Sequence, residues 1–413
     1  MRAAAATLFL AQGGVSPECQ KVADAECAEC YALIGSRPCD GPMVARQSGP
    51  GAAEWRCYSP STLANESYHS GSCYCSRDAE LRKVFSDCDQ GVTTTTVFEQ
   101  NQAGSKCYRI PTIIPTQDGA LLAFAEQRLD GCGDGGSHNL VLRRSEDGGL
   151  TWGEIVVAVK GDGVALSNPN PVEVALAGGK RAVLLHYDTQ NNPSTAHHGK
   201  NMQVWSYDGG KTWSDTKDIS ADMPSGFVGC MPGPSAGVQG PDGTIYFTCH
   251  GFGTQAFLYW SQDLGATWHA SAPLPGLDEC SVAQLANTSL LMNCRTGAGH
   301  RAQVIWGADG TPRTGVVPHP ELKDPNCQGS VVRDGATVVL TNNNATTRTH
   351  LVTRVSADGG ATWADGRVVT AGPSAYSQGV AWTGRFGVLY ETGTVSAYER
   401  IDFSSWASGQ VLV

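Results

Sequence analysis

The octapeptide SEDGGLTW, residues 145–152, recurs three more times along the chain. The copies read SYDGGKTW at 206–213, SQDLGATW at 261–268 and SADGGATW at 356–363. An Asp-Gly pair is a strong hairpin-turn signal, because glycine accepts the positive φ that such turns require. The Ser hydroxyl and the Asp carboxylate can accept backbone N–H groups across the turn. We therefore predict that each copy is a self-satisfied hairpin turn whose Trp begins the next strand with a buried face.

The spacing of the copies predicts the architecture. They begin at 145, 206, 261 and 356, so the last interval is nearly twice the others. A decayed copy fits midway, at WGADGTPRTG, which keeps Asp309-Gly310 and has lost the Trp. With a first unit near 100–145 there are about six units of roughly fifty residues, and repeats of this size with one hairpin each are typical of a β-propeller. We therefore predict an all-β, six-bladed β-propeller. We do not expect the octapeptide to be a calcium-binding loop, because such a loop would need more acidic ligands at alternate positions.

The bulk composition excludes several function classes. The net charge is −10, and an acidic chain is not expected to bind nucleic acid or an anionic membrane, because nothing offsets phosphate repulsion. No run approaches the ~18 apolar residues that a membrane span needs, so we predict no transmembrane segment. Residues 3–11, AAAATLFLA, follow Arg2 and resemble a short signal h-region. We therefore expect a secreted or lumenal protein, a lysosomal-type compartment included.

Cysteines are concentrated near the N-terminus, with eight of the 15 before residue 90. These are Cys19, Cys27, Cys30, Cys39, Cys57, Cys73, Cys75 and Cys88. The density and even count favour a disulfide-stapled module, and zinc is the alternative because Cys27-Ala-Glu-Cys30 has ligand spacing. We predict a possible signal segment at 1–14, a cysteine-rich module of unknown function at 15–95 and a propeller catalytic domain at 96–413.

The chemistry must come from residues outside the octapeptides. CYRIPTIIP, residues 107–115, carries Arg109 in a β-rich segment, and LLAFAEQRLDGCGDGGSHNLVLRRS follows at 121–145. The second segment contains Glu126, Arg128, Asp130 and Asp134. Together these segments resemble the exo-α-sialidase (neuraminidase) family, in which an Arg-Ile-Pro motif, an AFAEQR strand and Ser-x-Asp-x-Gly-x-Thr-Trp boxes follow one another. The resemblance runs from about residue 104 to the C-terminus.

The resemblance implies an arginine triad that binds the substrate carboxylate. Arg109 matches its first member, Arg295 in LLMNCRTG the second, and Arg348 in TTRTHLVTRVS the third. Arg128, at the end of the AFAEQR segment, is expected as a further substrate contact. Glu391, in VLYETG, matches the acid that orients the first arginine. A planar guanidinium suits this task because it meets a carboxylate with two parallel hydrogen bonds.

The resemblance also implies three catalytic residues. Tyr376, in GPSAYSQ, matches the family nucleophile, and its neutral phenol avoids the repulsion that a carboxylate nucleophile would meet beside the substrate carboxylate. A phenol with a pKa near ~10 needs a base beside it, and Glu279 in LDECSVAQL matches that partner. Asp134 is assigned as the general acid because it lies ten residues before Arg144, the spacing expected from the family. Asp130 is the alternative in the same loop.

The implied activity is retaining hydrolysis of terminal α-linked sialic acids on glycoproteins, glycolipids such as gangliosides, or oligosaccharides. Two alternatives remain open: a trans-sialidase that transfers the sugar to an acceptor glycan, and a non-catalytic sialoglycan-binding propeller. The ten histidines contain no HExxH pattern, so we expect no catalytic metal, and no cofactor is implied.

Overall fold

The computed structural model describes residues 44–47, 55–58, 92–190, 199–251 and 254–408. The chain divides into two compact units, Met1–Thr94 and Thr95–Val413. In the first unit, described residues 44–47 and 55–58 form one antiparallel pair, β1 (Val44–Gln47) with β2 (Trp55–Tyr58), and Thr93 and Thr94 begin a strand that continues into the second unit. The predicted signal segment and the side chains of the eight N-terminal cysteines lie outside what the structure describes.

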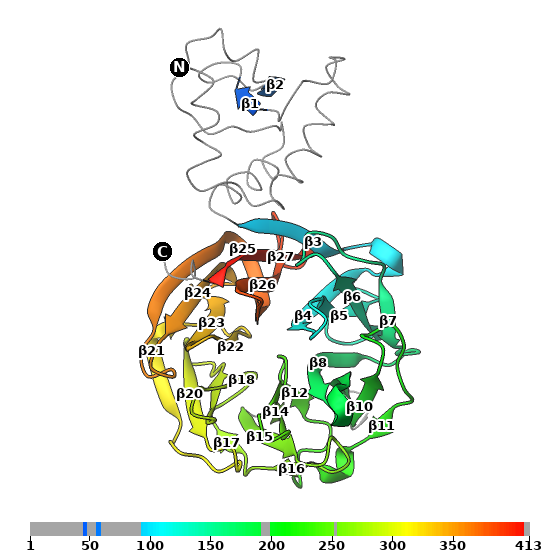
Figure 1. The fold of residues 1–413 in the computed structure, drawn as a ribbon, viewed down its shortest axis with the longest axis vertical. Helices are drawn as coiled ribbons and strands as arrows, with labels where there is room; N and C mark the ends of the chain where they lie inside the picture. Colours follow the sequence, from blue (N-terminus) through cyan, green and yellow to red (C-terminus); the bar gives the residue numbers. More distant parts are fainter. Residues whose placement is uncertain (1–43, 48–54, 59–91, 191–198, 252–253, 409–413) are drawn as a thin grey trace. The chain divides into compact units, whose positions relative to one another are not determined.

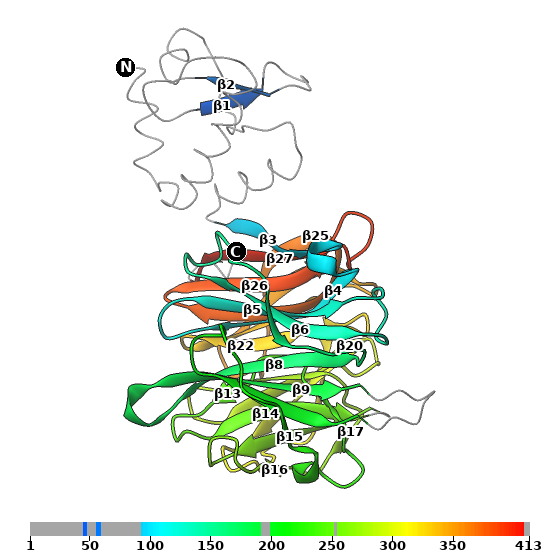
Figure 2. The same ribbon diagram turned by 90° about the vertical axis from the view of Figure 1, so that its right-hand side faces the viewer.

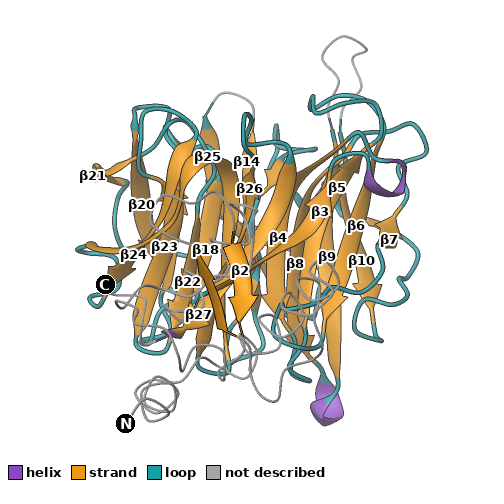
Figure 3. Cartoon of the chain, turned by 90° about the horizontal axis from the view of Figure 1, so that it is seen from above, coloured by secondary structure: helices purple, strands orange, loops and turns teal. Residues whose placement is uncertain are grey.

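The second unit consists of β-sheets arranged around a common centre, like the blades of a propeller (Figure 1), and almost all of its regular structure is strand (Figure 3). Three of the sheets are four-stranded and antiparallel. One comprises β4 (Cys107–Pro115), β5 (Leu121–Arg128), β6 (His138–Ser145) and β7 (Val156–Val159). The next comprises β8 (Leu166–Ala175), β9 (Arg181–Thr189), β10 (Asn201–Ser206) and β11 (Lys217–Asp218). The third comprises β18 (Cys280–Gln284), β19 (Leu290–Cys294), β20 (His300–Trp306) and β21 (Val317–Lys323).

Two further sheets complete the arrangement. The six-stranded sheet contains β12 (Met231–Pro232), β13 (Val238–Gln239), β14 (Ile245–Gly251), β15 (Gln255–Ser261), β16 (His269–Ala270) and β17 (Leu274–Pro275). The seven-stranded sheet contains β22 (Ser330–Asp334), β23 (Thr337–Asn343), β24 (Thr349–Ser356), β25 (Ala364–Trp382), β26 (Arg385–Thr392), β27 (Arg400–Ala407) and β3 (Thr93–Glu99). The described helices are three 3₁₀ turns, η1 (Gln102–Gly104), η2 (Ala177–Gly179) and η3 (Ser220–Asp222). None of the described helices is long and apolar enough to cross a membrane.

The all-β, propeller-like prediction is confirmed, but the repeat count does not translate into six separate sheets. The 19-residue β25 pairs with β24 along its first part and with β26 along its second part, so backbone pairing continues from one neighbouring sheet into the next. The second unit therefore has five hydrogen-bonded sheets among its described residues.

The first and last strands of the unit lie in the same sheet, where β3 pairs with β27 (Figure 2). The hydroxyl of Thr96 also donates to a carboxylate oxygen of Asp402 at 2.9 Å, across 306 positions of sequence. The ring of sheets is therefore closed by joining the beginning of the unit to its end.

Each octapeptide connects two consecutive, paired strands of a sheet and saturates its own turn. In the first copy, the Ser145 hydroxyl accepts the Gly149 N–H at 2.8 Å and Asp147 accepts the Thr151 N–H at 2.9 Å. The other three copies repeat both bonds. The predicted self-satisfied turn is thus confirmed.

The position of the Trp differs between copies. Trp152 lies ahead of β7 and is half-buried, because its ring packs back onto a neighbouring sheet. Trp268 and Trp363 directly precede β16 and β25, and Trp268 is buried as predicted.

The octapeptide tryptophans join neighbouring sheets. The Trp152 ring packs edge-on against Phe403 of β27 at 5.6 Å, and its indole N–H donates to Thr95 of β3 at 3.1 Å. The Trp268 indole N–H likewise donates to Gln203 of β10, in the preceding sheet, at 3.0 Å. The repeat therefore links neighbouring sheets in addition to forming a turn.

The close packing of the first octapeptide turn against the neighbouring sheet predicts a large stability effect for Gly149→Ala. Gly149 has φ +94°, and an added Cβ would overlap the buried ring of Phe403. We expect the free energy of unfolding to fall by about 2–4 kcal/mol, from left-handed strain plus overpacking. Gly119→Ala is the matched control, because Gly119 has φ +88° and nothing within 4 Å of an added Cβ. Equal losses for both variants in urea denaturation would show that the packing of Gly149 against Phe403 does not contribute to stability.

Candidate active site

Glu391 of β26 is fully buried, and its carboxylate collects four N–H donors. Arg109 donates through Nε at 2.9 Å and Nη2 at 3.1 Å. The backbone N–H groups of Ile110 and Tyr376 donate at 2.9 and 3.1 Å. The carboxylate therefore fixes one arginine and the two strands β4 and β25 at a single point.

Local backbone irregularities supply two of these donors. The register of β4 against β5 shifts between Arg109 and Thr112, and Ile110 lies in this irregularity at φ +57°, a rare conformation for a β-branched residue. A second register shift interrupts the β25–β26 ladder around Tyr376. Each irregularity frees a backbone N–H from the sheet, and Glu391 accepts both. The Arg-Ile-Pro motif thus encodes a strained bulge that is compensated by this carboxylate.

Tyr376 of β25 is buried, and its hydroxyl donates to the carboxylate of Glu279. Arg295 lies beside both groups, with Nη1 2.9 Å from the Glu279 carboxylate and 3.5 Å from the phenol oxygen. The guanidinium groups of Arg109 and Arg348 lie 5.1 and 5.4 Å from the centre of the Tyr376 ring. Burial and the nearby Glu279 raise the pKa of the Tyr376 phenol well above its usual value, although Arg109 and Arg295 act against the shift. The phenol is therefore neutral and paired with a carboxylate.

Two residues that the sequence analysis missed connect the three arginines. The Tyr398 hydroxyl accepts a hydrogen bond from Arg348 at 2.9 Å, and its ring lies 4.4 Å from the guanidinium carbon of Arg109. Asn326 accepts from Arg295 through its side chain at 2.6 Å and from Arg348 through its carbonyl at 3.1 Å. Tyr398 and Asn326 thus set the spacing between neighbouring guanidinium groups.

The sequence offers only weak signals for these residues, because both lie in connections between strands. Asn326 belongs to a segment held by a fully buried ion pair between Arg301 and Asp324, and Asp324 also accepts the Cys327 N–H at 2.8 Å. Asp278 was also missed, and its carboxylate forms an ion pair with Arg295, 3.1 Å from Nε. The sequence signal for Asp278 is its position directly before the predicted base Glu279.

One guanidinium of the arginine cluster lacks a carboxylate partner. Arg109 is paired with Glu391, and Arg295 is paired with Glu279. Within the part of the chain that the structure describes, no carboxylate pairs with Arg348, whose guanidinium is bound by uncharged oxygens. An anion that contacts all three guanidinium groups would therefore supply the charged partner that Arg348 lacks.

The loop between β5 and β6 brings Asp134 to the arginines and keeps Asp130 apart. The exposed Asp134 carboxylate lies 2.9 Å from Arg128 Nη1 and 3.6 Å from Arg109 Nη1. Burial acts to raise the pKa of Asp134, but the charges of Arg128 and Arg109 outweigh it and hold the pKa below its usual value. Asp130 instead accepts the Ser137 N–H at 2.8 Å, within its own loop.

Arg128 lies beneath this loop with 2% of its surface exposed. It pairs with Glu126 through Nη2 at 2.6 Å and donates to the Cys132 carbonyl at 2.6 Å and to Asp134 at 2.9 Å. These contacts occupy its guanidinium and tie it to the loop.

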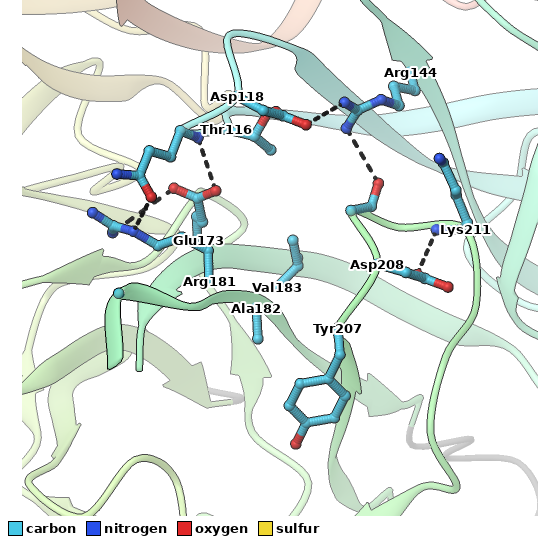
Figure 4. Close-up of a pocket in the computed structure, with 13 residues that line it drawn as sticks. Thr116, Asp118, Arg144, Glu173, Arg181, Ala182, Val183, Tyr207, Asp208 and Lys211 are labelled. Atoms are coloured by element: carbon cyan, nitrogen blue, oxygen red, sulfur yellow. Dashed lines mark hydrogen bonds and ion pairs between the residues drawn. The ribbon is translucent and has the colours of Figure 1, made fainter. Parts of the chain in front are cut away.

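A separate pocket of about 550 Å³ lies near the first two octapeptides (Figure 4). Its lining includes Asp118, Arg144, Glu173, Arg181, Tyr207 and Lys211. Its charged groups include the Arg144–Asp118 pair at 2.6 Å. The pocket shares no residue with the Tyr376 cluster, which we define as Tyr376, Glu279, Glu391, Arg109, Arg295 and Arg348. Among the described residues, no group of three or more His, Cys, Asp or Glu side chains is placed to hold a metal ion. The Tyr376 cluster is therefore the candidate active site.

Known proteins resemble this chain in sequence. The model of the BNR repeat-like domain matches residues 119–388. The sialidase of Micromonospora viridifaciens is 31% identical over 340 residues, which cover 73% of this chain and 52% of that protein. This chain belongs to the sialidase family.

Solved structures resemble this sialidase-family chain in fold. The Hadza microbial sialidase Hz136 has a TM-score of 0.67 and 22% identity, over 78% of this chain and 69% of that one. The intramolecular trans-sialidase from Ruminococcus gnavus has a TM-score of 0.62 and 17% identity, over 78% of this chain and 98% of that one. The chain spans about half the length of the Micromonospora sialidase.

Proposed function

We propose that this chain is an exo-α-sialidase, a glycoside hydrolase that removes terminal α-linked sialic acid from glycoproteins, gangliosides or oligosaccharides with retention of configuration. The observation that carries the proposal is the contact between the Tyr376 phenol and the Glu279 carboxylate, next to Arg109, Arg295 and Arg348. A protein that only binds sialoglycans needs the arginines but has no use for a buried phenol paired with a base. This pairing favours catalysis over the binding-only alternative.

In the proposed complex the three arginines hold the substrate carboxylate. Arg348 supplies a guanidinium without a carboxylate partner among the described residues, while Arg109 is pre-oriented by Glu391 and Arg295 by Glu279. Because these guanidinium groups are already placed, little side-chain freedom is lost when the anion binds.

The first chemical step forms a glycosyl-enzyme. Asp134 gives its proton to the glycosidic oxygen, and the bond between that oxygen and the anomeric carbon breaks. At the same carbon the Tyr376 oxygen forms a bond, while Glu279 takes the phenolic proton. In the second step Asp134 removes a proton from water, whose oxygen attacks the anomeric carbon. Tyr376 then leaves and regains its proton from Glu279. Two inversions give net retention.

Asp134 must be protonated before the first step, although its arginine neighbours favour the anion in the free protein. The substrate carboxylate would neutralise Arg109 and place a negative charge near Asp134, and both effects raise the pKa of that carboxyl. We assign Arg128 to positioning Asp134, in place of the substrate contact expected from sequence, because its guanidinium is occupied within the protein.

Leaving-group dependence separates Asp134 from Asp130. Asp134→Ala is expected to lower kcat/KM for sialyllactose by about 10²-fold or more, because an alkoxide leaving group needs a proton. The same variant should lose much less activity on an aryl sialoside, whose phenolate leaves unaided. Asp130→Ala is the control from the same loop, and the ratio of the two kcat/KM values should stay at the wild-type level. A changed ratio in Asp130→Ala alone would move the acid role to Asp130.

The activity is tested by incubating the purified chain with a fluorogenic α-sialoside and following the released sugar by ¹H NMR. Early accumulation of the α-anomer would support retention, and early β-anomer would overturn it. Absence of turnover on both this substrate and sialyllactose would overturn the enzyme proposal. Added lactose tests the trans-sialidase alternative, since transfer would yield sialyllactose in place of free sialic acid.

We also propose that the second unit is a six-bladed propeller. The support is that β25 can be counted twice, as the outer strand after β22, β23 and β24 and as the inner strand before β26, β27 and β3. This division yields two four-stranded blades from the seven-stranded sheet.

A secreted or lumenal location is proposed as well. Its support is the set of three disulfides among the described residues, because such bonds persist mainly in oxidising compartments.

A further inference from the structure

Two disulfides lie directly beside candidate catalytic residues. Cys280 follows Glu279, Cys294 precedes Arg295, and the two cysteines are bonded across the β18–β19 ladder. This bond lies next to the ion pair between Glu279 and Arg295, whose nitrogen and oxygen are 2.9 Å apart. The β-ladder already fixes these two strands, because Cys280 and Cys294 are register partners within it.

The second disulfide joins a strand to a loop residue that takes part in no described β-ladder. Cys107 lies two positions before Arg109 in β4, and Cys132 lies two positions before Asp134 in the loop after β5. The bond therefore ties the loop of the proposed acid to the strand of the first arginine. Asp134 and Arg109 approach to 3.6 Å at this junction.

The loop has few other constraints. Its segment DGCGDGG contains four glycines, which have the largest backbone freedom of any residue. No residue from 129 to 137 is buried, so no apolar packing holds the loop in place. Its contacts to the site are the bonds from Arg128 to the Cys132 carbonyl and the Asp134 carboxylate, the ion pair of Asp134 with Arg109, and the disulfide. Outside the site, Gln100 Nε2 lies 3.6 Å from Cys132 Sγ and the Gly163 N–H donates to the Ser137 hydroxyl at 3.2 Å.

We propose that the Cys107–Cys132 disulfide is a positioning device for the general acid. It holds Asp134 over the arginines, and its loss releases the loop without opening a β-sheet. The inference rests on the proposed function, because it assigns the bond to the proton-transfer step of that reaction.

The position of the bond also makes the acid step sensitive to reductants. Of the six disulfide cysteines that the structure describes, five are buried and Cys132 is half-buried. A dithiol such as dithiothreitol can therefore reach Cys132 first, forming two thiols while the reagent becomes a cyclic disulfide. Reduction at low dithiothreitol is expected to open Cys107–Cys132 before the other two.

The test compares two double variants of the full chain. Cys107→Ala/Cys132→Ala removes the proposed positioning bond. Cys230→Ala/Cys249→Ala removes a disulfide of similar span, 19 positions against 25, that adjoins none of the assigned catalytic residues. For each we measure Tm and the ratio of kcat/KM for sialyllactose to kcat/KM for an aryl sialoside.

We expect Cys107→Ala/Cys132→Ala to lower this ratio by about 10-fold, because only the poor leaving group needs the acid. The control variant should lower Tm and keep the wild-type ratio. An unchanged ratio in Cys107→Ala/Cys132→Ala, or an equal fall in both variants, would overturn the inference.

If the first variant does not fold, wild-type protein is reduced at low dithiothreitol, its free thiols are alkylated and mapped, and the same ratio is measured. Turnover by wild type with an unchanged ratio sinks this inference alone, whereas no turnover by wild type sinks the proposed function and this inference with it.

Discussion

Tyr376→Phe is expected to lower kcat/KM for an α-sialoside by about 10³-fold or more, with little loss of stability. The phenyl ring keeps the packing of Tyr376 against Ile110 and Ala375, so the fold is retained. Only the oxygen is lost, and with it the proposed nucleophile and the hydrogen bond to Glu279. The free energy of unfolding should change by about 1 kcal/mol, the usual contribution of one hydrogen bond. Initial rates and urea denaturation measure both quantities.

Tyr398→Phe is the matched control, because it removes a second phenol oxygen from the same cluster. That oxygen holds Arg348 at 2.9 Å and does not touch Glu279. We expect about a 10-fold rise in KM with kcat little changed, since a looser arginine weakens carboxylate binding. If Tyr376→Phe kept a tenth of the wild-type activity, or if Tyr398→Phe lost as much kcat, Tyr376 would not be the nucleophile.

Glu391→Gln is expected to reduce both stability and substrate binding. The substitution keeps the shape of the side chain but leaves the Arg109 charge buried without its counter-ion, and it places an amide NH₂ among N–H donors. Breaking one half of a buried ion pair costs about 3–5 kcal/mol. We expect a loss of that size in the free energy of unfolding and a rise in KM of about 10-fold or more.

Glu399→Gln provides the comparison for this prediction. Glu399 accepts the N–H groups of Thr394, Val395 and Ser396 at 2.8 Å, in the connection from β26 to β27. Its carboxylate lacks a buried cation such as Arg109, so the loss should be about 1 kcal/mol with KM unchanged. Equal losses for both variants would show that Glu391 acts only as an acceptor of backbone hydrogen bonds.

The fold could be predicted from sequence where its determinants are local. SEDGGLTW contains every group that its turn needs, since Ser145, Asp147 and Thr151 bond to one another and to the turn backbone. The sheet boundaries were less predictable. The continuation of β25 from β24 to β26 depends on how two neighbouring sheets meet. The pairing partner changes at Gly372-Pro373-Ser374, where a Gly-Pro pair ordinarily indicates a turn and the structure instead has a continuous strand.

The candidate site shows the same division. Residues in distinctive motifs, such as Arg109 and Tyr376, lie together although 267 positions separate them in sequence. Tyr398, Asn326 and the Cys107–Cys132 bond were not predicted, because their roles depend on contacts through space. A lone Tyr or Asn in a connection between strands has no local pattern that indicates which arginine it will meet.

The pairing of β3 with β27 has a consequence for the order of folding. The ribosome synthesises protein at about 5–20 residues per second. The interval between the synthesis of Thr96 and that of its partner Asp402 is therefore roughly 15–60 s. The other described sheets can complete themselves during this interval, because their strands follow one another in sequence. Ring closure is therefore the last step of assembly and the one with the greatest loop entropy. Until then both edges of the nascent ring remain unpaired, which makes this seam the place where a second nascent chain could insert its own strand.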